Sequence, residues 1–307
     1  ECESENGFPS PEKADQPLIC ITVKDHTSKK IIVFGMGNFV NDREDVQYIN
    51  CSSETHLVET FTKFWVEYNP DIITGWNVKF FDIPYLMNRF RYLMGDDWLN
   101  QFSPWGVVEQ RSATVLFASR EQQVWNIMGV DTLDYLDLYR KFTFVRRESY
   151  KLDYIGEVEL GQNKLDNPYD TFKEFYSNDY QRFVEYNIQD VELVDKLEDK
   201  LQLIALHLTM AYEAKVNYQD VFGQVRIWDC IIYHHLRSKN IVPPAIQESK
   251  TSSGYEGAYV KDPVVGFHDW VCSFDLNSLY PHLIMQYNIS PETMVGFEPV
   301  SYTHLRA

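Results

Sequence analysis

The sequence has too few cysteines, in too irregular a pattern, for a disulfide scaffold or a zinc cluster. Its 307 residues include five cysteines, which are scattered and show no C-x-x-C spacing. We therefore expect reduced, buried thiols. The sequence also lacks an apolar run of the ~18 residues that a membrane span needs and a signal peptide at its start. These absences predict a cytoplasmic protein with no membrane partner.

Positive charge is scarce as well. The sequence has 28 Lys and Arg against 45 Asp and Glu, a formal net charge of −17. Binding to phosphates usually leaves a basic imprint, so the net charge taken alone argues against a nucleic-acid partner. Hydrophobic residues make up 44% of the chain and aromatic residues 15%, which is typical of a globular protein and excludes a disordered one. The length allows one large domain or two ordinary ones.

Strand and helix patterns alternate in the first 100 residues. Alternating apolar and polar residues predict strands at residues 18–23, 29–37 and 71–76. Helical spacing after a serine cap predicts a helix at residues 53–69. A second helix, at residues 84–95, ends at a glycine. This alternation predicts an α/β layer architecture.

Later segments show longer helical patterns. We expect a hairpin within residues 111–127, a long helix at residues 179–215 and a second helix from about residue 222 to residue 242. A strand-rich segment at residues 254–266 precedes a short strand at residues 271–274.

Asp82 stands just after the strand predicted at residues 71–76 and two residues before Pro84. Aspartate is a preferred helix cap, and proline suits the first turn of a helix, so Asp82 can be read as a cap. It can equally be read as a metal ligand at the edge of a sheet, where the sites of α/β folds collect. The local sequence leaves both interpretations open.

Asp190 lies inside the apolar stripe of the long predicted helix. A carboxylate on a buried seam is unfavourable unless it is paired or coordinated. Tyr186, one helical turn earlier, shares its face, so a hydrogen bond between the two is one solution and a salt bridge to a buried arginine is another. A bound metal ion would compensate for the burial of the Asp190 carboxylate better than either of these. The other acidic residues of the helix, Asp195 and Glu198 among them, are expected mostly on its outer faces.

A site with two metal ions about 4 Å apart needs several carboxylates from separate elements. Mg²⁺ prefers oxygen ligands, and Mn²⁺ is the expected substitute. Asp82 and Asp190 would supply two ligands, and Glu1 or Glu3 a third. The Tyr186 hydroxyl would orient an attacking water. The residues therefore predict a two-magnesium hydrolytic site.

Four segments, in chain order, resemble motifs of the family B DNA polymerases. GWNVKFFDIPY at residues 75–85 is similar to the second exonuclease motif, and YNIQD at residues 186–190 to the third. GYEGAYV at residues 254–260 is similar to the element that joins the two activities. SFDLNSLYPHLIMQYN at residues 273–288 resembles the first polymerase motif. The likeness covers residues 1 to about 299 and points in particular to the replicative polymerases of T-even-like tailed bacteriophages.

The first exonuclease motif of that family is D-x-E. ESENGFP at residues 3–9 is similar to the segment that follows this motif. The resemblance then places Glu1 at the glutamate of the motif, with the aspartate before residue 1. In the alternative, Glu3 is the glutamate and Glu1 takes the place of the aspartate.

The resemblance implies a role for each matching residue. Glu1, Asp82 and Asp190 would bind the metal ions of a 3′→5′ exonuclease, and Tyr186 would position the water. Asn77 and Phe81 would line the single-stranded end of the primer.

The polymerase motifs imply a second set of roles. Asp275 would be a catalytic residue that binds the two Mg²⁺ ions of the polymerase. The incoming nucleotide would contact Ser278, Leu279 and Tyr280. Tyr255 and Gly257 would follow the DNA.

A local basic stretch between residues 140 and 151, which includes Arg146 and Arg147, is interleaved with aromatic residues. Cations with aromatic rings suit single-stranded DNA, on which stacking contributes ~1–3 kcal/mol per base. A half-buried strand pair explains the pattern equally well. The hairpin at residues 111–127 resembles the strand-separating hairpin of the family.

The resemblance also implies a fold and a division into domains. An RNase H-like exonuclease domain, with a mixed sheet flanked by helices, is expected at residues 1–205, and a helical connection at residues 206–246. The first strands of a polymerase palm are expected at residues 247–300. SYTHLRA at residues 301–307 resembles read-through from a sequencing adaptor, and we expect a non-native, poorly ordered tail.

The sequence contains no D-T-D and no K-x-x-x-N-S-x-Y-G motif, so we expect no polymerase activity from this chain and an impaired exonuclease. The expected partners are DNA primer-template, the single-stranded 3′ end of a primer, a dNTP and a sliding clamp, in the cytoplasm of an infected bacterium. The alternatives are a stand-alone DEDD-type exonuclease and a non-catalytic fragment that binds single-stranded DNA. The motif at residues 273–288 argues against the stand-alone nuclease, which has no use for it.

Overall fold

The structure is a computed structural model that describes residues 1–3, 9–114, 121–165, 167–243 and 260–296. The chain divides into two compact units, Glu1–Ala245 and Ile246–Ala307. The boundary near residue 205, between the exonuclease domain and the helical connection, stays a prediction. The segments at 254–259 and 301–307, with Tyr255, Gly257 and the tail, lie outside the described residues.

A three-stranded sheet forms the centre of the first unit. It contains β1 (Cys20–Lys24), β2 (Ile31–Gly35) and β3 (Val46–Asn50). β1 pairs antiparallel with β2, and β2 pairs parallel with β3. The strands predicted at 18–23 and 29–37 are therefore confirmed as β1 and β2. The third strand was not predicted, because its five residues follow a charged loop and carry little alternation.

Two strand pairs complete the described sheets. β4 (Ile72–Gly75) runs parallel to β7 (Asp131–Asp134), and β5 (Val108–Thr114) forms an antiparallel hairpin with β6 (Glu121–Ile127). The predicted strand at 71–76 is confirmed, and a hairpin is present, although β5 begins three residues before the predicted range of 111–127. The predicted first arm was residues 114–118, of which 115–118 lie outside the described residues, whereas the second arm, 123–127, is confirmed in β6. β4 and β7 end at the same edge because they are parallel.

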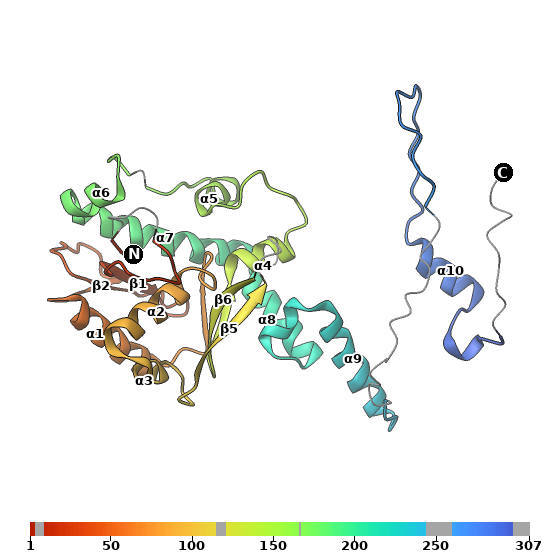
Figure 1. The fold of residues 1–307 in the computed structure, drawn as a ribbon, viewed down its shortest axis with the longest axis horizontal. Coiled ribbons are helices and arrows are strands. Elements are labelled where there is room, and N and C mark those ends of the chain that lie inside the picture. Colours follow the sequence, from red (N-terminus) through yellow and green to blue (C-terminus); the bar gives the residue numbers. More distant parts are fainter. Residues whose placement is uncertain (4–8, 115–120, 166, 244–259, 297–307) are drawn as a thin grey trace. The chain divides into compact units, whose positions relative to one another are not determined.

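Helices cover both faces of the central sheet. The helices of the first unit are α1 (Glu54–Tyr68), α2 (Asp82–Met94), α3 (Asp96–Leu99), α4 (Tyr135–Phe142), α5 (Leu152–Leu160), α6 (Phe172–Asn178), α7 (Tyr180–Leu201), α8 (Leu203–Ala214) and α9 (Gln224–Ser238). Figure 1 shows α7 on one side of β1 and β2, with α1 and α2 on the other. The result is a mixed α/β fold with helical layers around a sheet.

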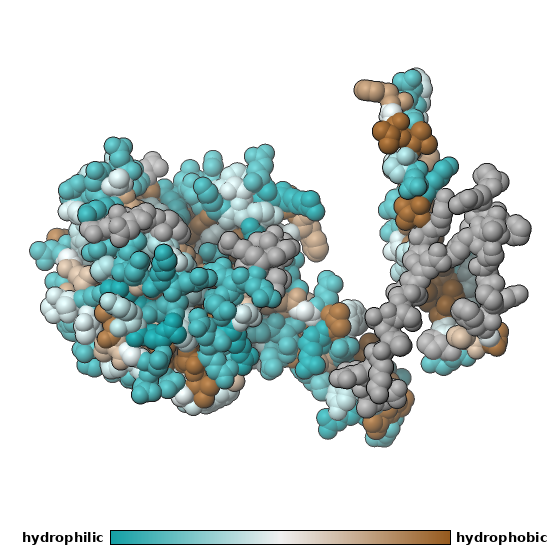
Figure 2. Space-filling model, in the orientation of Figure 1, coloured by the Kyte–Doolittle hydropathy of each residue, from teal (hydrophilic) through white to brown (hydrophobic). Residues whose placement is uncertain are grey.

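Apolar side chains on the two faces of the sheet belong to two separate clusters. Ile31 and Val33 pack with Phe183 of α7, whereas Phe34 of the same strand packs with Leu57 and Phe61 of α1. Alternate residues of a strand point to opposite faces, so one strand serves both layers. The surface of the first unit in Figure 2 is largely hydrophilic.

The helix ends follow local sequence signals. The Ser53 hydroxyl accepts a hydrogen bond from the backbone N–H of His56 at the start of α1, as predicted. α2 ends at Gly95, whose φ of 89° suits glycine. All five cysteines are free. Cys2, Cys20 and Cys51 are buried as expected, whereas Cys230 is half-buried and Cys272 is exposed, so the prediction of buried thiols is wrong for these two.

The prediction of a single long helix at residues 179–215 is wrong in one respect, because two helices cover this range. Gln202 has a φ of 52° and separates α7 from α8. The Glu198 carboxylate explains the new start, because it accepts hydrogen bonds from the backbone N–H of Ile204 at 3.0 Å and of Ala205 at 3.3 Å. Glu198 is 8% exposed, so the prediction that it lies on an outer face is also wrong.

The second unit contains α10 (Leu279–Tyr287) in its described part. Residues 260–278 form no strand, so the short palm strand predicted at residues 271–274 is not found there. A strand needs a partner to satisfy its backbone, and the described part of this unit offers none. Among the described residues, no helix is long and apolar enough to cross a membrane.

Candidate functional site

The segment that carries Asp82 leaves β4 and turns sharply into α2. Asn77 has a φ of 65°, a left-handed conformation that asparagine tolerates, and its carbonyl accepts a hydrogen bond from the N–H of Phe81 at 3.0 Å. Phe81, not Asp82, is the N-cap of α2, and it makes no side-chain cap bond. The interpretation of Asp82 as the helix cap is therefore wrong, and its carboxylate is left for another use.

The first three residues extend the central sheet beside β1. Cys2 forms an antiparallel bridge with Leu18. The N–H of Ile19 donates to the Glu1 carbonyl at 2.9 Å, and the N–H of Glu3 donates to the Pro17 carbonyl at 2.8 Å. This pairing fixes the backbone of Glu1 next to the start of β1.

Asp190 and Tyr186 lie one turn apart on α7 and share a partner. The Lys164 ammonium donates to Oδ2 of Asp190 at 2.5 Å and to the Tyr186 hydroxyl at 3.4 Å. Lys164 also lies 5.2 Å from the centre of the Tyr186 ring. The salt bridge expected as one solution to the burial of Asp190 is thus present, with a lysine rather than an arginine.

The carboxylates of Glu1, Asp82 and Asp190 act on one another. Desolvation raises the pKa of Asp82 to about 6; the N-terminal ammonium opposes this shift, and the negative charges of Glu1 and Asp190 add to it. Asp82 is nevertheless exposed at the surface of the described chain. Desolvation also raises the pKa of Asp190 to about 6, opposed by Lys164 and supported by Glu1. The three predicted metal ligands thus influence one another electrostatically, but their carboxylate oxygens do not all lie within 4.8 Å of one another.

The surroundings of the Asp190 carboxylate favour a bound cation. Oδ1 of Asp190 is buried and has no hydrogen-bond partner among the described residues, although its other oxygen binds Lys164. Burial raises the pKa of Tyr186, and the charge of Asp190 adds to this, so the phenol keeps its proton at neutral pH. A buried carboxylate oxygen without a partner among the described residues, within the electrostatic influence of Glu1, fits a divalent metal ion with oxygen ligands.

Asp134 holds the backbone of the segment that precedes Asp82. It is 2% exposed and accepts hydrogen bonds from the N–H groups of Asn77 at 3.0 Å, Lys79 at 3.0 Å and Leu136 at 2.9 Å. Burial raises the pKa of Asp134 to about 7, and the three donors act in the opposite direction. The ring of Phe81 stacks on Tyr85 with centroids 6.2 Å apart.

The sequence reasoning missed Lys164 and Asp134. Lys164 lies in a loop 22 residues before Tyr186, and no periodicity links the two positions. Asp134 has a weak local signal, because an aspartate directly before a helical pattern suggests a cap. Its bonds to Asn77 and Lys79 join residues more than 50 positions apart, and such contacts are invisible in the sequence.

The basic stretch forms a helix and a loop, so the interpretation as a strand pair is wrong. The Arg147 guanidinium donates to Glu159 at 2.7 Å and to the Tyr139 hydroxyl at 3.0 Å, which occupies it structurally. Arg146 is exposed and follows Phe144, which is 98% exposed, by two residues. This loop reaches the Asp82 segment through the Trp76 indole N–H, which donates to the Tyr150 carbonyl at 3.1 Å.

The predicted polymerase residues are solvent-exposed in the second unit. Asp275, Ser278, Leu279 and Tyr280 all lie in its exposed surface. Within residues 260–296, Asp275 makes no hydrogen bond or ion pair. Ser278 precedes α10 with a φ of 52°. The described residues of this unit therefore do not assemble a second cluster of carboxylates.

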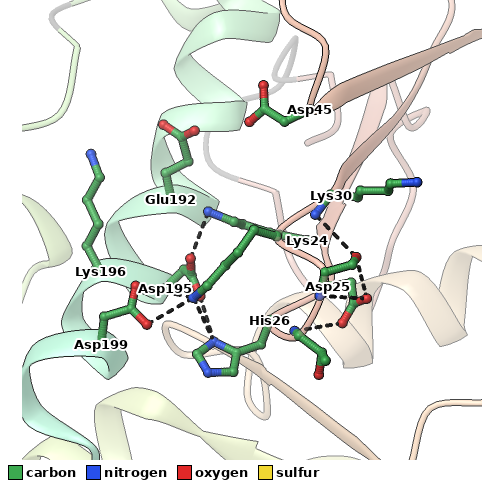
Figure 3. A network of polar contacts seen from close by, with 12 residues as sticks. Lys24, Asp25, His26, Lys30, Asp45, Glu192, Asp195, Lys196 and Asp199 are labelled. Atoms are coloured by element: carbon green, nitrogen blue, oxygen red, sulfur yellow. Dashed lines mark hydrogen bonds and ion pairs between the residues drawn. The ribbon is translucent and has the colours of Figure 1, made fainter.

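A different acidic group joins the β1–β2 hairpin to α7 (Figure 3). Ligand atoms of His26, Asp195 and Asp199 lie within 4.8 Å of one another. However, the ammonium groups of Lys24 and Lys29 lie 2.7 and 2.8 Å from the Asp195 carboxylate. Two lysines already neutralise this group, so we interpret it as a structural ion-pair network. Asp195 is 9% exposed, and the prediction that it lies on an outer face is wrong.

Comparisons with known proteins cover both units. A family model described as DNA polymerase family B, exonuclease domain, matches residues 1–155, and one described as DNA polymerase family B matches residues 219–306. The chain is 36% identical to a DNA-directed DNA polymerase of Escherichia phage RB69, across 99% of this chain and 36% of that protein. It is 33% identical to a DNA-directed DNA polymerase of Enterobacteria phage T4, across 94% of this chain and 34% of that protein.

A more distant relative is the DNA polymerase delta catalytic subunit of Caenorhabditis elegans. It is 29% identical across 80% of this chain and 24% of its own length. The chain thus spans 36% or less of the length of these three relatives.

Proposed function

Because the chain belongs to the family B DNA polymerases, we propose that its first unit removes nucleotides from the 3′ end of single-stranded DNA. This hydrolysis would be the proofreading step of a longer DNA-directed DNA polymerase. The exonuclease domains of the family are metal-dependent. The observation that carries the proposal is the buried Oδ1 of Asp190, which has no hydrogen-bond partner among the described residues, together with the electrostatic influence of Glu1 on both Asp190 and Asp82.

The fold proposed for residues 1–205 is RNase H-like. Its support is a sheet with mixed strand directions between two helical layers. Residues 206–246 would connect this domain to a polymerase palm that starts at residue 247. The family match at residues 219–306 favours this arrangement over a stand-alone exonuclease.

Glu1, Asp82 and Asp190 would hold two Mg²⁺ ions, with Mn²⁺ as a substitute. Bound there, the ions would lower the pKa of a water and stabilise negative charge on the phosphate. Glu1 rather than Glu3 is proposed as the ligand, because its carboxylate acts on the pKa of both Asp82 and Asp190.

The other residues of the cluster would handle water and substrate. The neutral Tyr186 hydroxyl can accept a hydrogen bond from Lys164 and still donate its proton to a water, which fixes the direction of attack. Asn77 and Phe81, on the turn before Asp82, would line the path of the primer end. Arg146 and Arg147 are proposed as DNA contacts, with Arg146 the freer of the two.

The second unit would serve the polymerase. Asp275 would bind its Mg²⁺ ions, and Ser278, Leu279 and Tyr280 would contact the nucleotide. Tyr255 and Gly257 would contact DNA, and a sliding clamp would be a partner of the longer protein. These assignments are supported by the family match at residues 219–306.

The test is digestion of a 5′-labelled single-stranded oligonucleotide in Mg²⁺. Two forms of the chain are assayed. One is the 307-residue chain, and the other, the extended chain, carries two added residues, Asp followed by any residue, directly before Glu1, because the first exonuclease motif of the family is D-x-E. We expect shortening from the 3′ end by the extended chain, weaker shortening by the chain as it stands, and a loss of at least about a hundredfold when Asp190→Asn is introduced into the extended chain, since even residues that only support a ligand contribute 10–100-fold.

Asp199→Asn is the matched control, because Asp199 is an exposed carboxylate of the same helix, 54% exposed at its side chain. It should leave digestion unchanged. Absence of Mg²⁺-dependent digestion in both forms of the chain, or equal digestion by Asp190→Asn, would overturn the proposal.

A further inference from the structure

Asp134 connects two parallel strands and the turn between β4 and α2. It is the last residue of β7 and lies opposite Gly75, the last residue of β4. The chain leaves β4 at Gly75 and reaches Asp82 after six residues. The backbone of this turn must therefore be held close to the ends of both strands.

The two oxygens of the Asp134 carboxylate are divided between two tasks. Oδ1 accepts from Leu136 at 2.9 Å, which caps α4, and from Asn77 at 3.0 Å. Oδ2 accepts from Lys79 at 3.0 Å. A helix cap needs one acceptor oxygen, so the bonds to Asn77 and Lys79 are additional to capping.

Those bonds fix the part of the turn with the least regular backbone. Asn77 has a φ of 65°, and its carbonyl accepts from Phe80 at 3.3 Å and Phe81 at 3.0 Å. The Val78 carbonyl accepts from Ile83 at 3.0 Å. The hydrogen bonds of the turn after Asn77 therefore depend on the backbone conformation of Asn77.

We propose that Asp134 is the positioning residue of this turn, and that its carboxylate clamp on Asn77 and Lys79 sets where Asp82 stands relative to Asp190. Asp134 touches neither substrate nor metal and acts through the backbone. The inference rests on the proposed function, because it assigns Asp82 and Asp190 to one metal site.

Asp134→Ser separates the clamp from the helix cap. Serine caps helices about as well as aspartate, so the bond to Leu136 can be kept. The serine side chain is shorter and has one oxygen, so it cannot also accept hydrogen bonds from the N–H groups of Asn77 and Lys79. Asp134→Asn keeps the volume and one acceptor oxygen, and it is the second variant if serine prevents folding. Asp137→Asn is the control. Asp137 is a buried carboxylate, 5% exposed, on α4, the helix that Asp134 caps, and it accepts none of these hydrogen bonds.

Two measurements on the 307-residue chain decide the question. Hydrogen–deuterium exchange is followed by mass spectrometry on peptides that cover residues 76–81. Mn²⁺ alone is titrated into each variant by calorimetry, with Asp190→Asn included. We expect Asp134→Ser to exchange faster in these peptides and to bind Mn²⁺ about tenfold more weakly, with Asp134→Asn intermediate and Asp137→Asn like the wild type.

The outcomes separate the two claims. If the wild type and Asp190→Asn bind Mn²⁺ equally, the metal site is not at Asp190, and the proposed function fails. If Mn²⁺ binding depends on Asp190 but the two Asp134 variants bind and exchange like the wild type, the site exists and the positioning role of Asp134 is refuted.

Discussion

The ion-pair network around Asp195 makes a pH-dependent contribution to stability that can be worked out from the structure. Asp195 is 9% exposed and binds Lys24 and Lys29 of the β1–β2 hairpin at 2.7 and 2.8 Å. Although burial opposes it, hydrogen bonds from Lys24, Lys29 and His26 lower the pKa of Asp195 from 3.8 to about 2. Because the folded chain holds the carboxylate ionised, the stabilisation is complete above pH 4 and is lost as the pH falls towards 2.

A change of about two pKa units corresponds to about 2–3 kcal/mol. We therefore expect Asp195→Asn to lower the free energy of unfolding by about 2–3 kcal/mol at pH 7 and by about half of that at pH 3. Urea unfolding of both chains at the two pH values measures the difference. Asp199→Asn is the control, because its exposed carboxylate shares only Lys29 and should change stability by less than about 1 kcal/mol. A pH-independent difference, or an effect of Asp199→Asn as large as that of Asp195→Asn, would refute the reasoning.

Three further substitutions test other parts of the structure. Glu54→Ala removes the carboxylate that pairs with the buried guanidinium of Arg89 at 2.7 Å, and we expect a loss of about 3–5 kcal/mol in urea unfolding; a loss below 1 kcal/mol contradicts this. Tyr186→Phe should slow 3′ digestion at least about tenfold while Mn²⁺ affinity in calorimetry is retained, and equal rates would exclude Tyr186 from positioning water. Arg146→Ala should weaken binding of a single-stranded oligonucleotide and reduce its salt dependence, measured by fluorescence anisotropy against the exposed Lys63→Ala as control; an equal effect of both would refute a specific contact.

Local sequence was sufficient where a single segment decides its own structure. The serine before residues 54–68 predicted the start of α1, and Gly95 predicted the end of α2, because a cap and a left-handed stop act within one helical turn. The break at Gln202 was missed for the opposite reason. The break depends on the Glu198 carboxylate, which was expected on an outer face but instead accepts hydrogen bonds from the first turn of α8.

The sequence suggested candidate ligands for the site but not the contacts that support them. Asp82 and Asp190 stand out locally, one after a strand and one inside an apolar stripe. Lys164 and Asp134 act through contacts across the fold, and the sequence between partners carries no period that would connect them. The charge of −17 was likewise a poor guide to a DNA partner, since metal ions and a few local cations can serve the end of a strand.

Anomalous diffraction from crystals soaked in MnCl₂ tests the central claim most directly. The account predicts a peak within about 2.5 Å of carboxylate oxygens of both Asp82 and Asp190, with the Lys164 ammonium displaced from Asp190. A peak beside His26, Asp195 and Asp199, with none between Asp82 and Asp190, would contradict it.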